Sequence, residues 1–391
     1  MSGFGDTPIF LDVTRLLYRL TRGRMPTGVD RVCLAYVRHF HHRAQAMMIW
    51  GGIAVGWSPS ASVALFDRLM GWEDGERPAS LGNALRAALK WPLCAVPAGS
   101  WVLNMGHSGL DQRSYLGWLR RKNMRLLVMV HDLIPITHPQ FCQAGAAKRH
   151  VRRMGLILGQ AEGIVSNSRH TAEMLGDHAR QAGVAVPPVA VIPLGAKKHR
   201  IVCEDEPGAV TEPYFVMVGT LEPRKNHAFV LQLWQRMLDE WHAAEIPHLL
   251  VIGQIGWMCG PVVHQLKTDE RMKQHVHLMT DCDDARLGHY LRHARAMLFP
   301  SHAEGYGLPL LEAMDLGVPV LTSPLPVFRE VAGLVPDYLD LDDGDAWLEA
   351  IHDYAQPASA RREAQLQRLR GFSAPSWSDH FSEFETFVSR L

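Results

Sequence analysis

Short apolar runs alternate along the chain with longer segments in which apolar residues recur every three to four positions. In the first half the apolar runs are residues 9–13, 46–50, 101–104, 126–130, 163–166 and 189–192. In the second half they are residues 214–218, 248–252, 276–278, 296–299, 319–322 and 333–335. Helical periodicity fills the intervals, for example over residues 29–41 and 143–158. This alternation predicts β-α-β units, and the continuous apolar runs predict a parallel sheet buried on both faces.

Two polar stretches divide the chain. Residues 195–213 contain cations, then acidic residues, proline and glycine without periodicity, which is typical of a linker. Residues 356–360 precede a terminal helical run with one apolar stripe formed by Trp377, Phe381, Phe384 and Val388. With 391 residues the chain is too long for one typical core. We expect an α/β protein with two Rossmann-like domains, residues 1–196 and 212–371, and a terminal helix at 372–391 that packs back on the first.

The formal net charge is zero, but the charges are unevenly distributed. Residues 1–195 contain 22 Lys and Arg against 12 Asp and Glu, a net charge of +10, so the remainder carries −10. A basic half can meet an anionic membrane surface, a phosphorylated lipid or nucleic acid, or it can be an ordinary solvated surface. Its cations are dispersed and no aromatic-basic motif accompanies them, so we expect no nucleic-acid partner.

Cysteine use and hydropathy suggest a cytoplasmic location. The six cysteines are scattered and form no C-x-x-C pair, so neither a zinc site nor a disulfide framework is indicated. No secretory signal is visible, and no apolar segment reaches the roughly 20 residues that span a bilayer. We expect a cytoplasmic protein that at most lies on the inner face of the cytoplasmic membrane.

The second half carries a glycine-containing loop between a strand and a helix. The run after Phe299 includes Glu304, Gly305, Tyr306, Gly307, Leu308 and, eight positions after the first carboxylate, Glu312. Loops at the carboxyl ends of strands are where open α/β sheets bind ligands. Glycines let backbone N–H groups approach an anion at the helix N-terminus, and two carboxylates at this spacing can accept hydrogen bonds from two sets of hydroxyls. A sugar and a ribose joined through a diphosphate would supply both features.

A second strand-turn-helix element places two adjacent cations at a strand end. Gly219 follows the apolar run 214–218, and Arg224 and Lys225 precede a helical pattern. Arginine supplies a planar fork and lysine a compact charge, which together suit a diphosphate.

These two elements resemble the retaining glycosyltransferases of family 4, which have the GT-B fold of two Rossmann-like domains facing across a cleft. The resemblance rests on E-x7-E with E-G-x-G-L-P and on V-G-x-x-x-P-R-K-N, and is strongest over residues 214–323. It implies that Arg224 and Lys225 bind the donor diphosphate, that Glu304 contacts the transferred sugar and that Glu312 contacts the ribose. It also implies phosphate binding by the backbone around Gly307 and Leu308.

Several first-half residues would form the other wall of that cleft. His131 and Asp132 follow the run 126–130 in the sequence H-D-L-I-P, which is similar to the family, and His131 is our candidate for a contact to the transferred sugar. A structural histidine is the alternative. Gly28 lies in a loop that resembles the family's glycine loop, with Thr-Gly in place of Gly-Gly. The acceptor-side candidates are Asn104, His107, Asp132 and Ser168, of which Ser168 can instead cap a helix.

The resemblance implies a hexosyltransferase that works by same-face attack, needs no cofactor and uses a nucleoside-diphosphate sugar as co-substrate. GDP-mannose is the favoured donor, since H-D-L-I-P with E-G-Y-G-L-P resembles mannosyltransferases. The acceptor would be a glycan, free or linked to polyprenyl diphosphate, in bacterial surface polysaccharide synthesis. Asp281-Cys-Asp283-Asp284 contains D-x-D, but we expect it to cap a helix rather than bind a metal. The alternatives are a sugar-nucleotide epimerase and a non-catalytic or nucleic-acid-binding protein of the same architecture.

Overall fold

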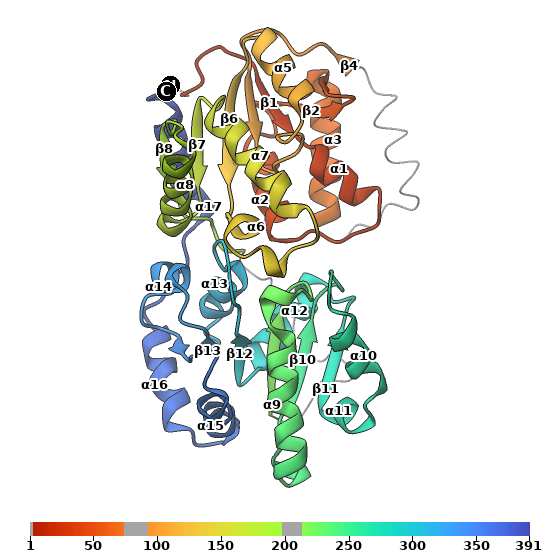
Figure 1. Cartoon of the computed structure of the whole chain (residues 1–391), viewed down its shortest axis with the longest axis vertical. Coiled ribbons are helices and arrows are strands. Elements are labelled where there is room, and N and C mark those ends of the chain that lie inside the picture. Colours follow the sequence, from red (N-terminus) through yellow and green to blue (C-terminus); the bar gives the residue numbers. More distant parts are fainter. Residues whose placement is uncertain (1–2, 74–92, 198–212) are drawn as a thin grey trace. The chain divides into compact units, whose positions relative to one another are not determined.

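The structure is a computed structural model and describes residues 3–73, 93–197 and 213–391 (Figure 1). The chain divides into two compact units, Met1–Ile136 with Gly145–Gly195 and Ser376–Leu391, and Thr137–Ala144 with Ala196–Pro375. The expected domains differ from these units in three places, because residues 137–144, residue 196 and residues 372–375 belong to the second unit. Most of the expected linker, residues 198–212, lies outside the described residues.

The first unit is built on an eight-stranded sheet in the order β4-β3-β2-β1-β5-β6-β7-β8. The strands are β1 (Ile9–Asp12), β2 (Gln45–Trp50), β3 (Ile53–Trp57), β4 (Leu93–Cys94), β5 (Trp101–Asn104), β6 (Arg125–Val130), β7 (Gly163–Ser166) and β8 (Val189–Val191). Neighbouring strands from β2 through β8 run parallel, whereas β3 is antiparallel to β2 and to β4. The six strands expected in this half are confirmed to within one residue.

The hydrophobic pattern missed the antiparallel β2–β3 hairpin. Its two-residue turn is Gly51-Gly52, with φ of 59° and 81°. Such a turn needs positive φ at both positions, which glycine adopts without strain, and its twist matches that of the flanking strands. A Gly-Gly pair between two apolar runs is a recognised hairpin signal, so the sequence did contain the information.

Helices cover both faces of the first sheet. They are α1 (Thr14–Leu20), α2 (Gly28–His39), α3 (Pro59–Glu73), α5 (Arg113–Arg121), α6 (Ile134–Thr137), α7 (Ala146–Leu158), α8 (Arg169–Ala182) and α17 (Trp377–Val388). Side chains of α5, α7 and α8 pack with Phe10, Val102 and Val128 on one face. On the other face Trp101 contacts Phe4, and the centroids of the two rings are 5.5 Å apart.

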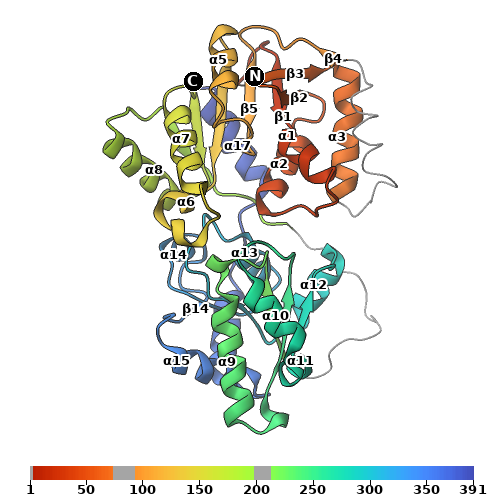
Figure 2. The ribbon, with the colours of Figure 1, turned by 45° about the vertical axis from the view of Figure 1, so that its right-hand side comes forward.

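The C-terminal helix α17 packs on the first unit, as expected. The ring of Phe384, which is fully buried, lies 5.2 Å from that of Tyr36 on α2. His380 Nδ1 hydrogen-bonds the carbonyl of Pro193, and its Nε2 hydrogen-bonds the Tyr36 hydroxyl. Both chain ends therefore lie on the same unit (Figure 2).

The second unit contains a six-stranded, fully parallel sheet in the order β11-β10-β9-β12-β13-β14. The strands are β9 (Tyr214–Val218), β10 (His248–Ile252), β11 (Val276–Met279), β12 (Ala296–Phe299), β13 (Val320–Thr322) and β14 (Asp337–Tyr338). Numbered along the unit this is the order 3-2-1-4-5-6 of a dinucleotide-binding Rossmann sheet, in which the direction of winding reverses between the first and fourth strands. That switch point lies between β9 and β12.

Two cores sandwich this sheet. The helices are α9 (His227–Glu240), α10 (Gly260–Thr268), α11 (Glu270–His275), α12 (Asp284–His293), α13 (Leu308–Asp315), α14 (Pro326–Ala332), α15 (Gly344–Ala355) and α16 (Ala360–Leu369). Residues of α9, α10, α11 and α15 pack with Phe215 and Met217 on one face, and residues of α12, α13, α14 and α16 pack with Tyr214 and Val216 on the other. The alternation of these four β9 residues explains their continuous apolar run.

The prediction of a strand at residues 333–335 was wrong. Residues 333–335 end helix α14 in a turn, in which Gly333 has φ of 57° and Val335 N–H donates to the carbonyl of Ala332. The strand is β14, two residues later, where Asp337 pairs with Leu321. Leu334 is 78% exposed, so this apolar residue lies in a surface turn and not in a buried strand.

Candidate functional site

The loop after β9 is shaped by two residues with positive φ. Gly219 has φ of 137°, and a Cβ there would lie 3.3 Å from Cε of Lys225. Asn226 has φ of 61° and joins the short 3₁₀ turn Pro223–Lys225 to α9. Asparagine tolerates this left-handed conformation better than most residues. The loop therefore turns sharply at the carboxyl end of β9, and Gly219 leaves room for the Lys225 side chain.

Arg224, Lys225 and Glu304 form one buried ion-pair cluster. Arg224 Nη1 lies 2.5 Å from Glu304 Oε2, and Lys225 Nζ lies 2.5 Å from Glu304 Oε1. A fourth charge, Glu222, lies 2.5 Å from Arg224 Nη2. The side chains are 22% exposed for Arg224 and 8% or less for the other three. Two cations and two carboxylates thus occupy the switch point of the sheet.

Further contacts hold the loop after β9 against the loop after β12. His302 N–H donates to the carbonyl of Arg224 at 2.7 Å, and Arg224 Nη1 donates to the carbonyl of Ala303 at 3.1 Å. Ser301 Oγ donates to Glu304 Oε1 at 3.1 Å. The Lys225 ammonium also lies 4.4 Å from the ring centroid of Phe299, the last residue of β12. The cations are therefore positioned by both strands.

Electrostatics favour the charged form of Glu304. Burial raises its pKa, but Arg224 and Lys225 outweigh that effect and lower the pKa to about 2. Burial lowers the pKa of Lys225, and Glu304 opposes this change by favouring the ammonium. Burial also raises the pKa of Glu222 against the effect of Arg224. Such a cluster is costly to desolvate and is a recognised mark of a functional site.

The glycine loop leads directly into α13. Gly307 is the residue before the helix and has φ of 101°, and a Cβ there would lie 2.9 Å from Cε1 of Phe328. Both facts require glycine at this position. Leu308 begins the helix, Pro309 has no N–H, and Leu310 and Leu311 donate to the carbonyl of Gly307, so the N–H of Leu308 is the donor at the helix start that can face an anion. Tyr306, in the loop, is buried, whereas Gly305 and Leu308 are half-buried.

Glu312 lies on α13 and is only 3% exposed. The structure thus brings together Arg224, Lys225 and Glu304 and keeps Glu312 on the helix that begins at the glycine loop. The sequence missed Glu222 as a member of the charge cluster. Its place three residues before Lys225, in the same turn, was the available signal.

The first unit gathers polar residues at the carboxyl ends of β1, β5 and β6. Asn104 Nδ2 donates to Asp12 Oδ2 at 2.8 Å and to the carbonyl of Ser108 at 2.9 Å. His131 Nε2 donates to the carbonyl of Met105 at 2.6 Å, and His107 Nε2 donates to that of Met129 at 2.6 Å. Backbone carbonyls accept only, so both rings carry their proton on Nε2. Burial lowers the pKa of both histidines, which are therefore neutral imidazoles.

Asp12 and His150 contact the candidate residues of the first unit, but the sequence did not single them out. Burial raises the pKa of Asp12 to about 6. Its Oδ1 accepts a hydrogen bond from the backbone N–H of Thr14. His150 Nε2 donates to the carbonyl of Asp132, and Arg153 Nη1 lies 3.3 Å from His150 Nδ1. Asp12 is the charged residue within the apolar run 9–13 and the last residue of β1, which was the signal for it. His150 lies within a helix, where one histidine among 21 carries no positional signal.

Two acceptor-side candidates have structural roles here. Asn104 is fully buried, and both of its donated hydrogen bonds stay within the first unit. Ser168 is also fully buried and is the N-cap of α8, where its Oγ accepts from Thr171 N–H at 3.1 Å. Capping was the alternative for Ser168, and the structure shows it. The Asp132 side chain accepts from Ile134 N–H at 3.0 Å and is half-buried.

Gly28 is the first residue of α2, which begins with a capping box. Thr27 N–H donates to Asp30 Oδ2 at 2.7 Å. Asp30 is fully buried and also pairs at 2.6 Å with both Arg15 and Arg19. The Thr that replaces a glycine here thus helps to cap a helix, and two arginines hold the loop that contains Gly28.

The D-x-D sequence has the capping role expected of it. Asp283 Oδ1 accepts from Arg286 N–H at 2.9 Å as the N-cap of α12. Within the described ranges, no group of three or more His, Cys, Asp or Glu side chains is arranged to hold a metal ion. In the same part of the chain, no helix is long and apolar enough to cross a membrane.

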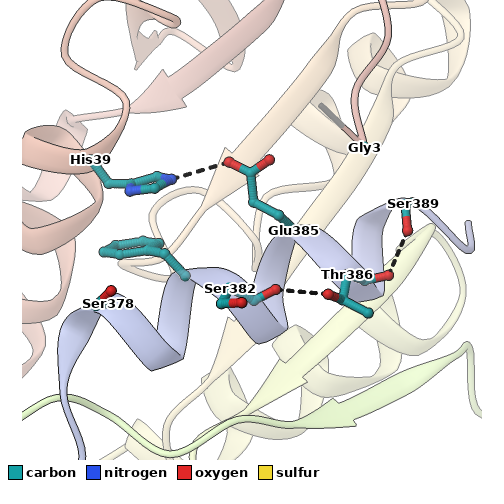
Figure 3. Close-up of a pocket in the computed structure, with 8 residues that line it drawn as sticks. Gly3, His39, Ser378, Ser382, Glu385, Thr386 and Ser389 are labelled. Atoms are coloured by element: carbon teal, nitrogen blue, oxygen red, sulfur yellow. Dashed lines mark hydrogen bonds and ion pairs between the residues drawn. The ribbon is translucent and has the colours of Figure 1, made fainter. Parts of the chain in front are cut away.

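A surface hollow of about 500 Å³ lies between α2 and α17 (Figure 3). The His39 ring stacks on Phe381 at 3.9 Å, and its Nε2 lies 3.1 Å from Glu385. Glu385 also pairs with Arg43 at 2.5 Å. His39 ends α2, six residues before β2 begins, so the hollow lies toward the amino ends of the strands. It is remote from the strand ends that carry the candidate residues of this unit.

Residues 204–334 match the family model described as "Glycosyl transferases group 1". The chain is 27% identical over 218 residues to the serotype-specific mannosyltransferase WbdA of Escherichia coli, covering 52% of this chain and 26% of WbdA. It is 35% identical over 162 residues to the O-antigen chain mannosyltransferase B of E. coli, covering 40% of this chain and 42% of that protein. The chain thus spans about a quarter to two fifths of the length of these relatives.

The fold is shared with a solved structure along nearly the whole length of both chains. The crystal structure of Anabaena Alr3699/HepE in complex with UDP-glucose aligns with a TM-score of 0.61, covering 98% of this chain and 100% of that one at 14% identity. At this identity the likeness establishes the fold, two Rossmann-like units of the GT-B class, and function depends on the site.

Proposed function

We propose that this chain transfers a hexose from a nucleoside-diphosphate sugar to a glycan in surface polysaccharide synthesis, since residues 204–334 match the family model of the group 1 glycosyl transferases. The observation that carries the proposal is the Arg224–Lys225–Glu304 cluster at the switch point between β9 and β12. Ligands of open α/β sheets bind at that point, and two cations there suit a diphosphate. Mannose is the favoured sugar, since relatives that match this chain are named mannosyltransferases.

Transfer of the sugar requires the protein to stabilise the departing diphosphate. Arg224 presents the most exposed part of the cluster, and Glu222 and Glu304 hold its guanidinium in one orientation. Lys225 supplies a second fixed positive charge beneath it. Positioned charges that need not reorganise as the leaving group departs lower the barrier. The backbone N–H groups of Gly307 and Leu308 would bind the phosphates, and Glu304 and Glu312 would accept hydrogen bonds from sugar and ribose hydroxyls.

We propose retention of configuration by same-face attack, in which the leaving phosphate takes the acceptor proton. The two carboxylates at the strand ends of the first unit, Asp12 and Asp132, each accept a backbone N–H, which favours structural roles over nucleophilic ones. His131 is neutral and donates a hydrogen bond from Nε2 to the carbonyl of Met105. Its Nδ1 can then accept a hydrogen bond from a sugar hydroxyl. No metal or other cofactor takes part in this scheme.

The acceptor side is proposed to include a lipid-linked glycan at an anionic membrane. The support is the net charge of +10 over residues 1–195, which would favour polyprenyl-diphosphate headgroups and anionic lipids.

The test is a panel of sugar nucleotides, with GDP-mannose and UDP-glucose as the first pair. We expect GDP-mannose to raise the thermal unfolding temperature most, because it is the favoured donor. A ligand at 100 times its dissociation constant adds about 2.7 kcal/mol of stability, which is large enough to measure. We also expect transfer of labelled mannose to a mannose-containing oligosaccharide, with retained anomeric configuration and no loss in excess chelator. Conversion of the sugar nucleotide without any acceptor would favour the epimerase alternative, and stabilisation by no sugar nucleotide would contradict the proposal.

A further inference from the structure

His107 and His131 brace each other across two neighbouring strands of the first unit. The strands that precede them, β5 and β6, are adjacent and parallel. His107 Nε2 donates at 2.6 Å to the carbonyl of Met129, two residues before His131. His131 Nε2 donates at 2.6 Å to the carbonyl of Met105, two residues before His107. Each ring is therefore held in place by the segment that carries the other ring.

The second ring nitrogen of each histidine is open to a ligand. Within the described residues, Nδ1 of His107 and Nδ1 of His131 make no hydrogen bond, and neither is among the fully buried polar atoms that lack a partner. Both atoms are therefore in contact with solvent. Because Nε2 carries the proton, each Nδ1 has a lone pair and can only accept a hydrogen bond. The ring centroids are 5.3 Å apart, a separation comparable with the width of one sugar ring.

The backbone at His107 supplies a second observation. Its φ of 61° lies in the left-handed region, which residues other than glycine seldom adopt. Strained conformations of this kind persist where the surroundings impose them, and they are concentrated at functional sites. Here the strained residue is the one whose ring is fixed beside His131.

The surroundings keep both rings neutral. Burial lowers the pKa of His107, and the positive charges that His131, Arg153 and His150 can carry lower it further. Burial also lowers the pKa of His131, against the opposing effect of its bond to Met105. A neutral ring whose N–H is already used presents no donor to an anion, so a phosphate or carboxylate is a poor occupant of this position.

A metal ion is also a poor occupant, because it needs further ligands. In the part of the chain that the structure describes, no three His, Cys, Asp or Glu side chains are arranged to hold one. The third histidine nearby, His150, uses both ring nitrogens within the protein, since Nε2 donates to the carbonyl of Asp132 and Nδ1 lies 3.3 Å from Arg153 Nη1. Two lone pairs without a neighbouring ligand set suit a neutral donor such as a hydroxyl.

We propose that His107 and His131 act as a pair that binds two hydroxyls of one sugar ring, with each Nδ1 accepting a hydrogen bond from one hydroxyl. His107 thereby becomes a substrate-binding residue of equal standing with His131. The inference rests on the proposed function, because the sugar is either the transferred hexose or the residue of the acceptor that receives it. The experiment separates these two sources.

Two amide substitutions separate sugar binding from the structural bond. In His107→Gln the amide group reaches the position of Nε2, so its N–H can still donate to Met129, but nothing replaces Nδ1. In His107→Asn the amide group lies at the position of Nδ1, where its oxygen can accept from a hydroxyl, and the bond to Met129 is lost. His264→Gln, at an exposed position on α10, is the control.

The experiment measures kcat, the KM for both substrates and the unfolding temperature of the full chain, with the sugar nucleotide that the wild type uses best and a manno-oligosaccharide acceptor. His107→Gln should remain folded and raise one KM about three- to ten-fold, the size of one lost hydrogen bond. His107→Asn should retain more of the wild-type kcat/KM than His107→Gln, and His264→Gln should match the wild type. A higher KM for the sugar nucleotide, with unchanged affinity for the nucleoside diphosphate, assigns the pair to the transferred hexose. A higher KM for the acceptor alone assigns it to the acceptor.

Wild-type kcat and KM for both substrates in His107→Gln would overturn the proposal. A larger loss in His107→Asn than in His107→Gln would also overturn it, because the ring would then serve only its bond to Met129.

Imidazole ¹⁵N NMR of the histidine-labelled wild type tests the pair without turnover, with resonances assigned from His107→Gln and His131→Gln. We expect the sugar nucleotide or the manno-oligosaccharide to shift Nδ1 of both rings while Nε2 stays protonated. Unmoved Nδ1 resonances with both ligands at saturation would contradict the pair. The proposed function fails by a different result, a wild type that transfers no hexose from any sugar nucleotide.

Discussion

At the scale of single residues, the main finding is that the predicted diphosphate cations are paired with acidic side chains. The sequence identified Arg224, Lys225 and Glu304 as separate contacts to different parts of a donor. The structure places both cations within 2.5 Å of the Glu304 carboxylate. Contacts between residues about 80 positions apart depend on the order of the strands, which local patterns do not encode. The residue types were predictable, but their mutual pairing was not.

The pairing makes Glu304 a determinant of stability at low pH. Its folded-state pKa of about 2 lies below the usual 4.5, so the carboxylate contributes stability above pH 4.5 and loses it as pH falls toward 2. The shift corresponds to about 3 kcal/mol. We expect the free energy of unfolding of the wild type to fall over this window more steeply than that of Glu304→Gln, as measured by urea unfolding from pH 6 to pH 3.

Glu363→Gln serves as the control for that prediction, because Glu363 is exposed and 4.0 Å from its arginine partner. Its pH profile should match that of the wild type. Identical slopes for Glu304→Gln and the wild type between pH 4.5 and 3 would show that the ion pairs do not stabilise the folded state.

At the scale of elements, periodicity predicted most strands and helices because burial on both faces of a parallel sheet produces apolar runs with a clear length. It failed for elements whose position depends on turn residues or on a short pairing at the sheet edge. The β2–β3 hairpin depends on turn glycines rather than on periodicity, and β14 is a half-buried edge strand of two residues. The glycine loop before α13 was predictable in position, and the need for positive φ at Gly307 explains its composition.

The terminal helix α17 provides a prediction at this scale. Phe384 is fully buried and contacts Tyr36, Phe40 and Phe4. We expect Phe384→Ala to destabilise the first unit by about 3–5 kcal/mol, the usual cost of removing a buried phenylalanine ring. Hydrogen exchange read by mass spectrometry should show faster exchange in the first unit and little change in the second. Glu383→Ala, exposed on the same helix, should alter exchange in neither.

Uniformly faster exchange in both units of Phe384→Ala would contradict the division of the chain into separately stabilised units.

At the scale of the whole molecule, the sequence predicted two Rossmann-like domains but not how every segment is divided between them. Residues 137–144 follow His131 closely in the chain and yet belong to the second unit. Within that unit, Trp257 Nε1 donates to the carbonyl of Phe141, and the Phe141 ring stacks on His302 at 4.8 Å. Such an excursion leaves no compositional break, so a boundary drawn from linkers alone could not include it.

The uneven charge makes a prediction at this scale. Sedimentation with vesicles that contain phosphatidylglycerol should recover the chain at low salt, and recovery should fall as salt shortens the range of electrostatic attraction. A triple change of the exposed residues Arg120, Arg121 and Lys122 to Gln should weaken recovery several-fold. Equal recovery with phosphatidylcholine vesicles alone would remove the electrostatic part of the membrane proposal.

The most direct test of the central claim is the rate of hexose transfer by Lys225→Ala, with the sugar nucleotide that stabilises the wild type most. Lys225 is buried, so circular dichroism and the unfolding temperature must first show that the variant is folded. The proposed role of Lys225 predicts a fall in turnover of about 10²–10³-fold, as expected when a fixed charge that stabilises a leaving group is removed. Turnover within two-fold of the wild type in a folded Lys225→Ala variant would contradict it.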